Sequence, residues 1–146
     1  MKISHILPAL ALLIIFSSCN KNKYQTKPQI TIESINGLIP VGGSMLAKLK
    51  FTQKDGKLGQ GTFTAIRNRL NQNPLPPGTA GADTLVSVIP QFPDLNQGEF
   101  QFSLDYSYLH ESDIENDTFN FKFAVVDRVG NKSDTVTSAA VVVLRP

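Results

Sequence analysis

Cys19 is the only cysteine among 146 residues, so its thiol is the only sulfur nucleophile of the chain. It follows an apolar run from Ile6 to Phe16, with Lys2 ahead of the run and two small serines directly before the sulfur. A positive start, a short apolar core and small residues are typical of a secretory signal peptide. The run has about 11 residues, fewer than the roughly 20 that a membrane-spanning helix needs. We therefore predict that residues 1–18 are a signal peptide that is removed.

A signal peptide that ends on cysteine resembles the lipobox of bacterial lipoproteins. The resemblance implies that the Cys19 thiol is diacylated, that the chain is cut before Cys19, and that the new amine is acylated. One acyl chain gives marginal attachment, but each buried methylene contributes about 0.8 kcal/mol, so two or three fatty acyl chains hold a protein on a membrane. The alternative is an ordinary secreted protein with Cys19 as a free thiol, which is a redox liability in an oxidising compartment.

Histidine chemistry is limited to His110, because the only other histidine, His5, leaves with the signal peptide. One histidine without a further cysteine excludes a cysteine–histidine dyad and a multi-histidine zinc site. No glycine-rich loop that could hold a phosphate precedes a helical pattern. A serine–histidine–aspartate set around His110 stays open, although the sequence lacks a nucleophile elbow. We predict no catalytic residue, no cofactor and no enzyme, with a small envelope hydrolase as the alternative.

Acidic residues alternate along residues 111–117 and could turn their carboxylates to one side. The weak candidates for a cation site made in this way are Asp113, Glu115 and Asp117. A charged connection between strands is usually just solvated. We therefore predict no metal site.

Tyr106 and Tyr108 alternate directly after the apolar stretch 100–104 and could form a platform for a sugar ring. The alternative is that they continue a core-facing row with their hydroxyl groups at its rim. Thr84 and Thr135 each stand between an aspartate and an apolar residue, which resembles the pattern glycosylated on threonine in exported Bacteroidota proteins. Aspartate and threonine at the exit of a turn explain the same two triplets.

Composition limits the class of protein. The formal net charge is +2, and no basic stripe backed by aromatic residues occurs, which argues against nucleic-acid binding. Without the signal peptide about 128 residues remain, enough for one domain. No disulfide can form within the mature chain, so an apolar core alone must hold the fold.

From Gln29 onward, apolar and polar residues alternate with a period of two, as in strands with one buried face. The clearest alternations cover residues 30–33, 45–52, 99–104 and 119–125, and weaker strands are expected at 62–70, 84–89 and 135–144. Turn-forming residues separate these stretches, and no long helical pattern occurs. We predict an all-β fold over residues 29–146, an antiparallel β-sandwich of about seven strands. Residues 19–28 are expected to be the lipidated cysteine and a flexible tether.

The sharpest local pattern is a hairpin whose turn carries Asp127, Gly130 and Asn131. Gly130 and Asn131 adopt positive φ at low cost, which closes such a turn. The unit resembles the last hairpin of bacterial immunoglobulin-like and fibronectin-like modules, although the chain has no tryptophan and no cysteine pair. We take these turn residues as structural.

Residues 51–59, Phe-Thr-Gln-Lys-Asp-Gly-Lys-Leu-Gly, are similar to the Phe-x-Asp-x-Asp-Gly-Asp-x-Gly segment of a group of uncharacterised Bacteroidota lipoproteins. In that group a lipobox precedes one immunoglobulin-like domain that ends in the Asp-x-x-Gly-Asn-x-Ser hairpin. Here Gln53 and Lys57 replace two of the acids and only Asp55 remains, so a plain turn is expected instead of a calcium loop. The resemblance brings no known activity with it.

The resemblance implies a protein anchored in the outer membrane through Cys19. Surface lipoproteins of this group resemble one another in having acids after the cysteine, whereas residues 20–23 are Asn-Lys-Asn-Lys, so we expect the domain to face the periplasm. We predict a non-catalytic binding or scaffolding role with an envelope protein as partner, because exposed strand edges suit lateral docking. The alternative is a surface glycan-binding lipoprotein. The oligomeric state stays open.

Overall fold

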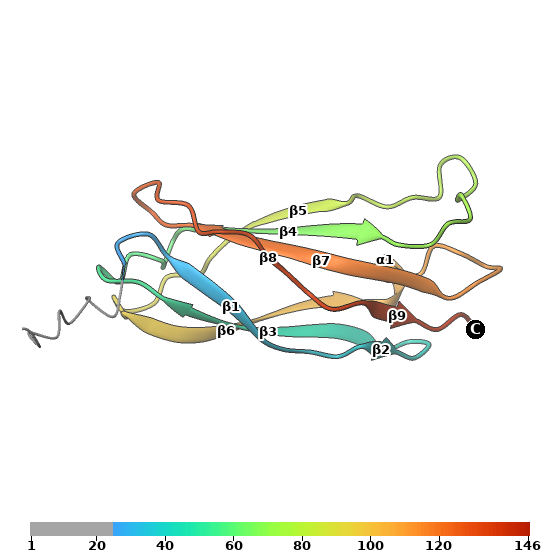
Figure 1. Cartoon of the computed structure of the whole chain (residues 1–146), viewed down its shortest axis with the longest axis horizontal. Helices are drawn as coiled ribbons and strands as arrows, with labels where there is room; N and C mark the ends of the chain where they lie inside the picture. Colours follow the sequence, from blue (N-terminus) through green and yellow to red (C-terminus); the bar gives the residue numbers. More distant parts are fainter. Residues whose placement is uncertain (1–24) are drawn as a thin grey trace, which may run out of the picture.

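The computed structural model describes residues 25–146 as a nearly all-β domain (Figure 1). The predicted signal peptide, Cys19 and residues 20–24 lie outside the described residues. The strands are β1 (Gln29–Ile35), β2 (Leu38–Ile39), β3 (Ser44–Thr52), β4 (Thr62–Arg69), β5 (Thr84–Val88), β6 (Gln97–Asp105), β7 (Asp117–Val126), β8 (Val136–Thr137) and β9 (Val141–Val143), and one helical turn, α1 (Tyr106–Leu109), follows β6. Within the described range, no helix is long and apolar enough to cross a membrane.

The strands form two sheets that pack face to face. The smaller sheet has the order β1-β3-β6, and the larger has the order β2-β9-β7-β4-β5, with β8 also paired to β7. All neighbours are antiparallel except β2 and β9, which are parallel. The predicted antiparallel β-sandwich of immunoglobulin-like and fibronectin-like type is confirmed.

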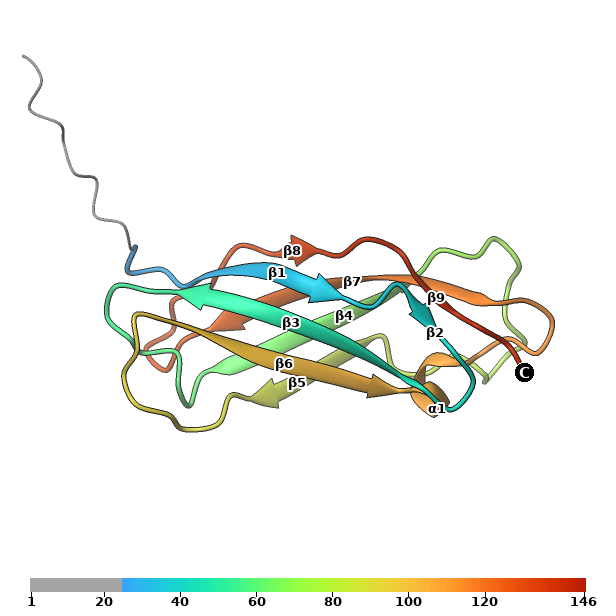
Figure 2. The ribbon, with the colours of Figure 1, turned by 90° about the horizontal axis from the view of Figure 1, so that it is seen from below.

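The sandwich is elongated and has two distinct ends (Figures 1 and 2). The described chain enters at one end, here named the N-terminal end, where the connections 53–61, 89–96 and 127–135 lie. The opposite end, here named the far end, holds the connection 70–83, helix α1, residues 110–116 and the C-terminus. Residues far apart in the sequence therefore meet at each end.

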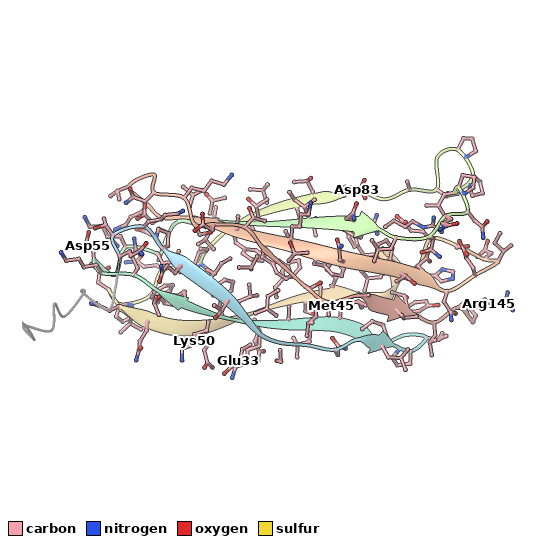
Figure 3. The ribbon with its side chains drawn as sticks, viewed as in Figure 1. Glu33, Met45, Lys50, Asp55, Asp83 and Arg145 are labelled. Atoms are coloured by element: carbon pink, nitrogen blue, oxygen red, sulfur yellow. The ribbon has the colours of Figure 1, made fainter. Side chains whose placement is uncertain are left out.

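The core lies between the sheets because the inward positions of β3, β4 and β7 are apolar. Met45 is fully buried between the layers, whereas Glu33 points away from the other sheet (Figure 3). The rings of Phe63, Phe102 and Phe123 meet in the interior, with centroids 5.1, 5.7 and 5.9 Å apart. Burying a phenylalanine contributes about 1.5–3 kcal/mol, so these rings are a main source of stability.

The strand predicted over 135–144 is wrong in one respect, because it consists of two short strands with a bulge between them. β8 and β9 pair with β7 in registers that differ by one residue, so 138–140 hold one residue more than the facing part of β7. Ser138 bridges the gap: its Oγ accepts a hydrogen bond from Phe121 N at 3.0 Å, and its N–H donates to Phe121 O at 2.8 Å. A side chain thus replaces a backbone carbonyl in the ladder.

The last four residues of the tether expected over 19–28 contact the domain. Gln25 O accepts a hydrogen bond from Lys54 N at 2.8 Å, and Lys27 Nζ pairs with Asp134 at 2.5 Å. Pro28 is buried. The segment from residue 25 to residue 28 is therefore fixed on the N-terminal end of the sandwich.

Candidate functional site

Arg67 is a buried arginine at the far end, with 3% of its surface exposed. On β4 it follows Phe63 and Ala65 at the inward positions, so alternation alone directs it inward. Its guanidinium carbon lies 4.9 Å from the ring centroid of Tyr108 and 5.0 Å from that of Phe119. This arrangement places a cation between two aromatic faces.

Hydrogen bonds complete the surroundings of Arg67. Nη1 donates to Tyr108 O at 2.7 Å, and Nη2 pairs with the Glu111 carboxylate, whose side chain is 5% exposed. The same carboxylate accepts from Gly81 N at 2.8 Å. Within residues 25–146, Arg67 Nε has no partner. The Glu111 carboxylate thus joins β4 to both the 110–116 segment and the 70–83 connection.

Arg69, two positions after Arg67 on β4, pairs with two acidic side chains. Its Nε lies 3.3 Å from Asp117 Oδ1, and its Nη2 lies 3.0 Å from Glu115 Oε1. Asp117 is fully buried, and its Oδ2 accepts from the N–H groups of Glu111 and Ser112 at 2.7 and 2.9 Å. These carboxylates close the 111–116 loop onto β4.

The cation site considered for Asp113, Glu115 and Asp117 finds no support in this geometry. Arg69 pairs with the carboxylates of both Glu115 and Asp117, and Asp113 is exposed. In the part of the chain from residue 25 on, no three His, Cys, Asp or Glu side chains gather in a group that could hold a metal ion. Sequence spacing did not reveal Arg69, because it lies on a strand more than forty positions earlier in the chain.

The premise of a shared platform for Tyr106 and Tyr108 is wrong, because the chain turns into α1 at residue 106 instead of continuing as a strand. Helix neighbours two positions apart point about 200° apart around the axis. Tyr106 stacks on His110 at 5.1 Å and donates its hydroxyl to Leu144 O at 2.7 Å. Tyr108 covers Arg67 and donates its hydroxyl to Ala82 O.

The ring of His110 packs against helix α1 at the far end. Its ring lies against Tyr106, and its buried Nε2 has no hydrogen-bond partner in residues 25–146. Burial raises the pKa of the Tyr106 hydroxyl, and the charge of Asp117 raises it further. The stacked pair therefore serves as part of the packing of α1.

The N-terminal end holds a second polar cluster, which joins the two sequence motifs. Gln53, fully buried, donates from Nε2 to Asp127 Oδ2 at 2.5 Å and to Thr26 O at 3.0 Å, and its Oε1 accepts from Lys57 N at 3.1 Å. The amide supplies a donor to Asp127, where a second carboxylate would repel it.

Asp127 organises its own turn. Its Oδ1 accepts from Val129 N at 3.0 Å and from Asn131 N at 2.8 Å, and its Oδ2 accepts from Asn131 Nδ2 at 2.9 Å. Gly130 closes the turn with φ of 96°, a conformation that favours glycine. Burial alone would raise the pKa of the Asp127 carboxyl, but the hydrogen bonds from Asn131, Val129 and Gln53 outweigh it and hold the pKa below its ordinary value.

An apolar groove follows the open side of the sandwich between β5 and β6. A cavity of about 320 Å³ lies at the N-terminal end and includes Phe51, Phe92 and Leu95 in its lining. A second cavity of about 200 Å³ continues it and shares Ile89, Pro90 and Phe100 with the first. This groove was not predicted, because no sequence pattern shows which strands become sheet edges.

Thr84 and Thr135 are both exposed, Thr84 as the first residue of β5 and Thr135 directly before β8. Their side chains are accessible, and their O-glycosylation stays a prediction.

No protein-family model and no curated protein matches the chain. Among solved structures, the chain is similar to a cohesin module of a Clostridium perfringens family 33 glycoside hydrolase, with 12% identity and a TM-score of 0.45 over 84% of this chain and 100% of that one. It is also similar to a β-glucosidase of Listeria innocua, in complex with gluconolactone (8% identity, TM-score 0.44) and with glucose (8% identity, TM-score 0.42). The matches cover 80% of this chain but only 16% of the glucosidase. At this level of similarity they bring no activity, ligand or partner to the chain.

Proposed function

We propose that this protein is a lipid-anchored, non-catalytic binding or scaffolding domain of the cell envelope, tethered through an acylated Cys19. The observation that supports the proposal is that residues 25–28 contact the N-terminal end, because a tether from an acylated Cys19 would join the domain there. Cys19 lies six positions before Gln25, and an extended chain spans about 3.5 Å per residue, so the N-terminal end lies within roughly 20 Å of the bilayer.

Charge at the N-terminal end agrees with this orientation. Lys54 and Lys132 are exposed there, and Lys57 is half-buried beside them. Arg128 and Lys27 at the same end are paired with aspartates. Lysines near a bilayer favour anionic headgroups, so the end that faces the membrane carries cations free to meet them.

The non-catalytic role is favoured by how the polar side chains are used. The far-end arginines hold loop carboxylates, and the Asp127 cluster fixes a turn and the N-terminal segment. A general acid or base needs a group within reach of a substrate, whereas these groups face one another. The hydrolase and glycan-binding alternatives have no observation that favours them.

The wider setting follows from the sequence resemblance. We place the domain on the periplasmic side of the outer membrane, because the residues after Cys19 are basic and amide side chains without an acid. Its exposed strand edges and faces are then open to an envelope protein partner.

Replacing Cys19 with alanine is expected to release the protein from the membrane. Without acyl chains the mature chain consists of its tether and its polar domain, and neither is proposed to insert into hydrocarbon. Phase partition with a cloud-point detergent, together with intact mass, measures the effect. The parent protein should enter the detergent phase, whereas the Cys19→Ala protein should enter the aqueous phase if its signal peptide is removed and should otherwise have the mass of the uncleaved, unacylated precursor.

Ser17→Ala is the matched control, since it keeps a small residue beside the cysteine and should stay lipidated. Intact mass of the purified protein gives an independent reading of the same step. A native polypeptide with an unmodified thiol would contradict the proposal, as would detergent-phase partition of a Cys19→Ala protein from which the signal peptide has been removed.

A further inference from the structure

β5 is a free edge of the larger sheet, since β4 is its only strand neighbour within residues 25–146. Ile89 N donates to Gly61 O at 2.8 Å, and Arg67 N donates to Asp83 O at 2.7 Å. In an antiparallel pair every second residue bonds to the same neighbour, so the odd-numbered residues of β5 face β4. The residues whose N–H and C=O groups point to the free edge are Thr84, Val86 and Val88.

The same residues make this edge apolar on its outer side. Val86 and Val88 are 65% and 72% exposed, and Ile66 on the adjoining strand is 37% exposed. No charged residue occurs within β5. Figure 2 shows β5 at the margin of the molecule, on the side where β6 is the edge of the other sheet, and the apolar groove opens between them.

The two edges of the smaller sheet are protected against pairing with another strand, whereas β5 is not. β1 carries a bulge at Glu33, and Lys48 bridges Glu33 and Glu99 across three strands at 2.8 and 2.7 Å. At the two ends of β6, Asn96 O accepts a hydrogen bond from Gln53 N, and Tyr106 N donates one to Gly43 O. The even-numbered residues of β6 therefore bond to β3. The residues left at the outer edge of β6 include the polar or charged Glu99, Gln101, Ser103 and Asp105. Bulges and charges are the usual means by which sheets avoid edge pairing.

We propose that β5 pairs with β5 of a second copy of this chain to form a symmetric dimer. An uncharged edge accepts an uncharged, β-branched strand, and β5 itself is such a strand. Antiparallel pairing about a twofold axis at Val86 sets Val86 opposite Val86 of the second copy and Thr84 opposite its Val88. The N–H and C=O groups of all these residues point to the free edge, as the pairing needs, and no like charges face each other.

The pairing closes on itself and covers apolar surface. Each copy uses its free β5 edge once, so the assembly stops at two, as a twofold interface requires. The groove beside β5, with Phe100 and Phe102 in its lining, opens on the side where the second copy sits. Asp83 and Pro90 bound the edge and limit the pairing to β5. If Cys19 anchors each copy, the antiparallel arrangement places the two anchors at opposite ends, and the dimer lies along the bilayer.

Cysteine cross-linking tests the register. In a hydrogen-bonded antiparallel pair the Cα atoms are about 5.5 Å apart, within the range of a disulfide. Val86→Cys in the mature chain with Cys19→Ser should therefore form a covalent dimer on mild oxidation. Val88→Cys is the matched control: residues 88 of the two copies would be roughly 13 Å apart, so it should stay monomeric, and it should cross-link when mixed with Thr84→Cys.

A disruption variant gives the second reading. Val86→Lys sets two like charges against each other at the twofold axis and should raise the dissociation constant at least about tenfold in sedimentation equilibrium. Val129→Lys, at an exposed valine of the N-terminal end, should leave dimerisation unchanged. Thermal unfolding of dilute samples establishes that both variants fold.

Three outcomes would overturn the dimer: equal cross-linking of Val86→Cys and Val88→Cys, no cross-linking of either, or a parent chain that sediments as a monomer at all concentrations. A monomer that instead captures an extended segment of another envelope protein through β5 also overturns it. Because these experiments use a chain without the acylated cysteine, their result is independent of whether the protein is anchored.

Discussion

Replacing Arg67 with methionine is expected to lower the free energy of unfolding by about 3–5 kcal/mol, the cost of leaving one partner of a buried ion pair alone. The change strands the Glu111 carboxylate, which is 5% exposed, next to an apolar side chain. It also removes the cation between the rings of Tyr108 and Phe119 and frees the carbonyl of Tyr108. A loss of this size is a large part of the total stability of a small domain, about 5–15 kcal/mol.

Urea unfolding of the parent chain and of Arg67→Met measures the loss, and the double variant Arg67→Met/Glu111→Leu identifies its cause. A buried ion pair replaced by apolar groups is often close to neutral, so the double variant should recover most of the stability. Lys48→Met is the matched control: Lys48 forms an ion pair with Glu33, but its side chain is 36% exposed, and its loss should have little effect. A double variant as unstable as Arg67→Met would show that cation–aromatic packing, and not the stranded carboxylate, sets the cost.

The sandwich could be predicted because each strand carries its own period-two signal. β3 and β7 alternate cleanly, and their inward residues form the core. The elements that were not predicted are too short to carry a period: α1 is one turn, and the bulge between β8 and β9 depends on a single side chain, Ser138. A four-residue helix and one extra residue leave no trace in an alternation of polar and apolar residues.

The clusters at the two ends could be predicted only in part. The alternation of β4 directs Arg67 inward and therefore calls for an acidic partner, but nothing in the sequence says that Glu111 supplies it. Residues 51–59 and the Asp127 hairpin were both recognised, yet each was interpreted as a separate turn. Their contact follows from β3 and β7 ending at the same end of the sandwich, which requires the strand order.

Replacing Asp127 with alanine is expected to lower the free energy of unfolding by about 3 kcal/mol, because hydrogen bonds to a charged group contribute roughly 1.5–3 kcal/mol and buried donors lose their acceptor. The donors left behind are Gln53 Nε2, Val129 N and two groups of Asn131. Release of Gln53 should also loosen Thr26, so hydrogen exchange at the N-terminal segment should increase more than exchange at the far end. Denaturant unfolding with exchange at both ends measures the two effects, and Asp113→Ala, at an exposed residue of the far end, is the control.

The Asp127 carboxylate should also make the parent chain sensitive to acid. Its pKa in the folded protein lies below its ordinary value, so its contribution to stability is fully present above about pH 4 and is lost as the pH falls through the folded pKa. Asp127→Asn lacks the titrating group and turns a second amide donor toward Gln53. It should be less stable than the parent at neutral pH, and the difference should narrow below about pH 4. Midpoints of urea unfolding measured from neutral to acidic pH test this, and parallel profiles for parent and variant would mean that the charge of Asp127 does not hold the turn to the N-terminal segment.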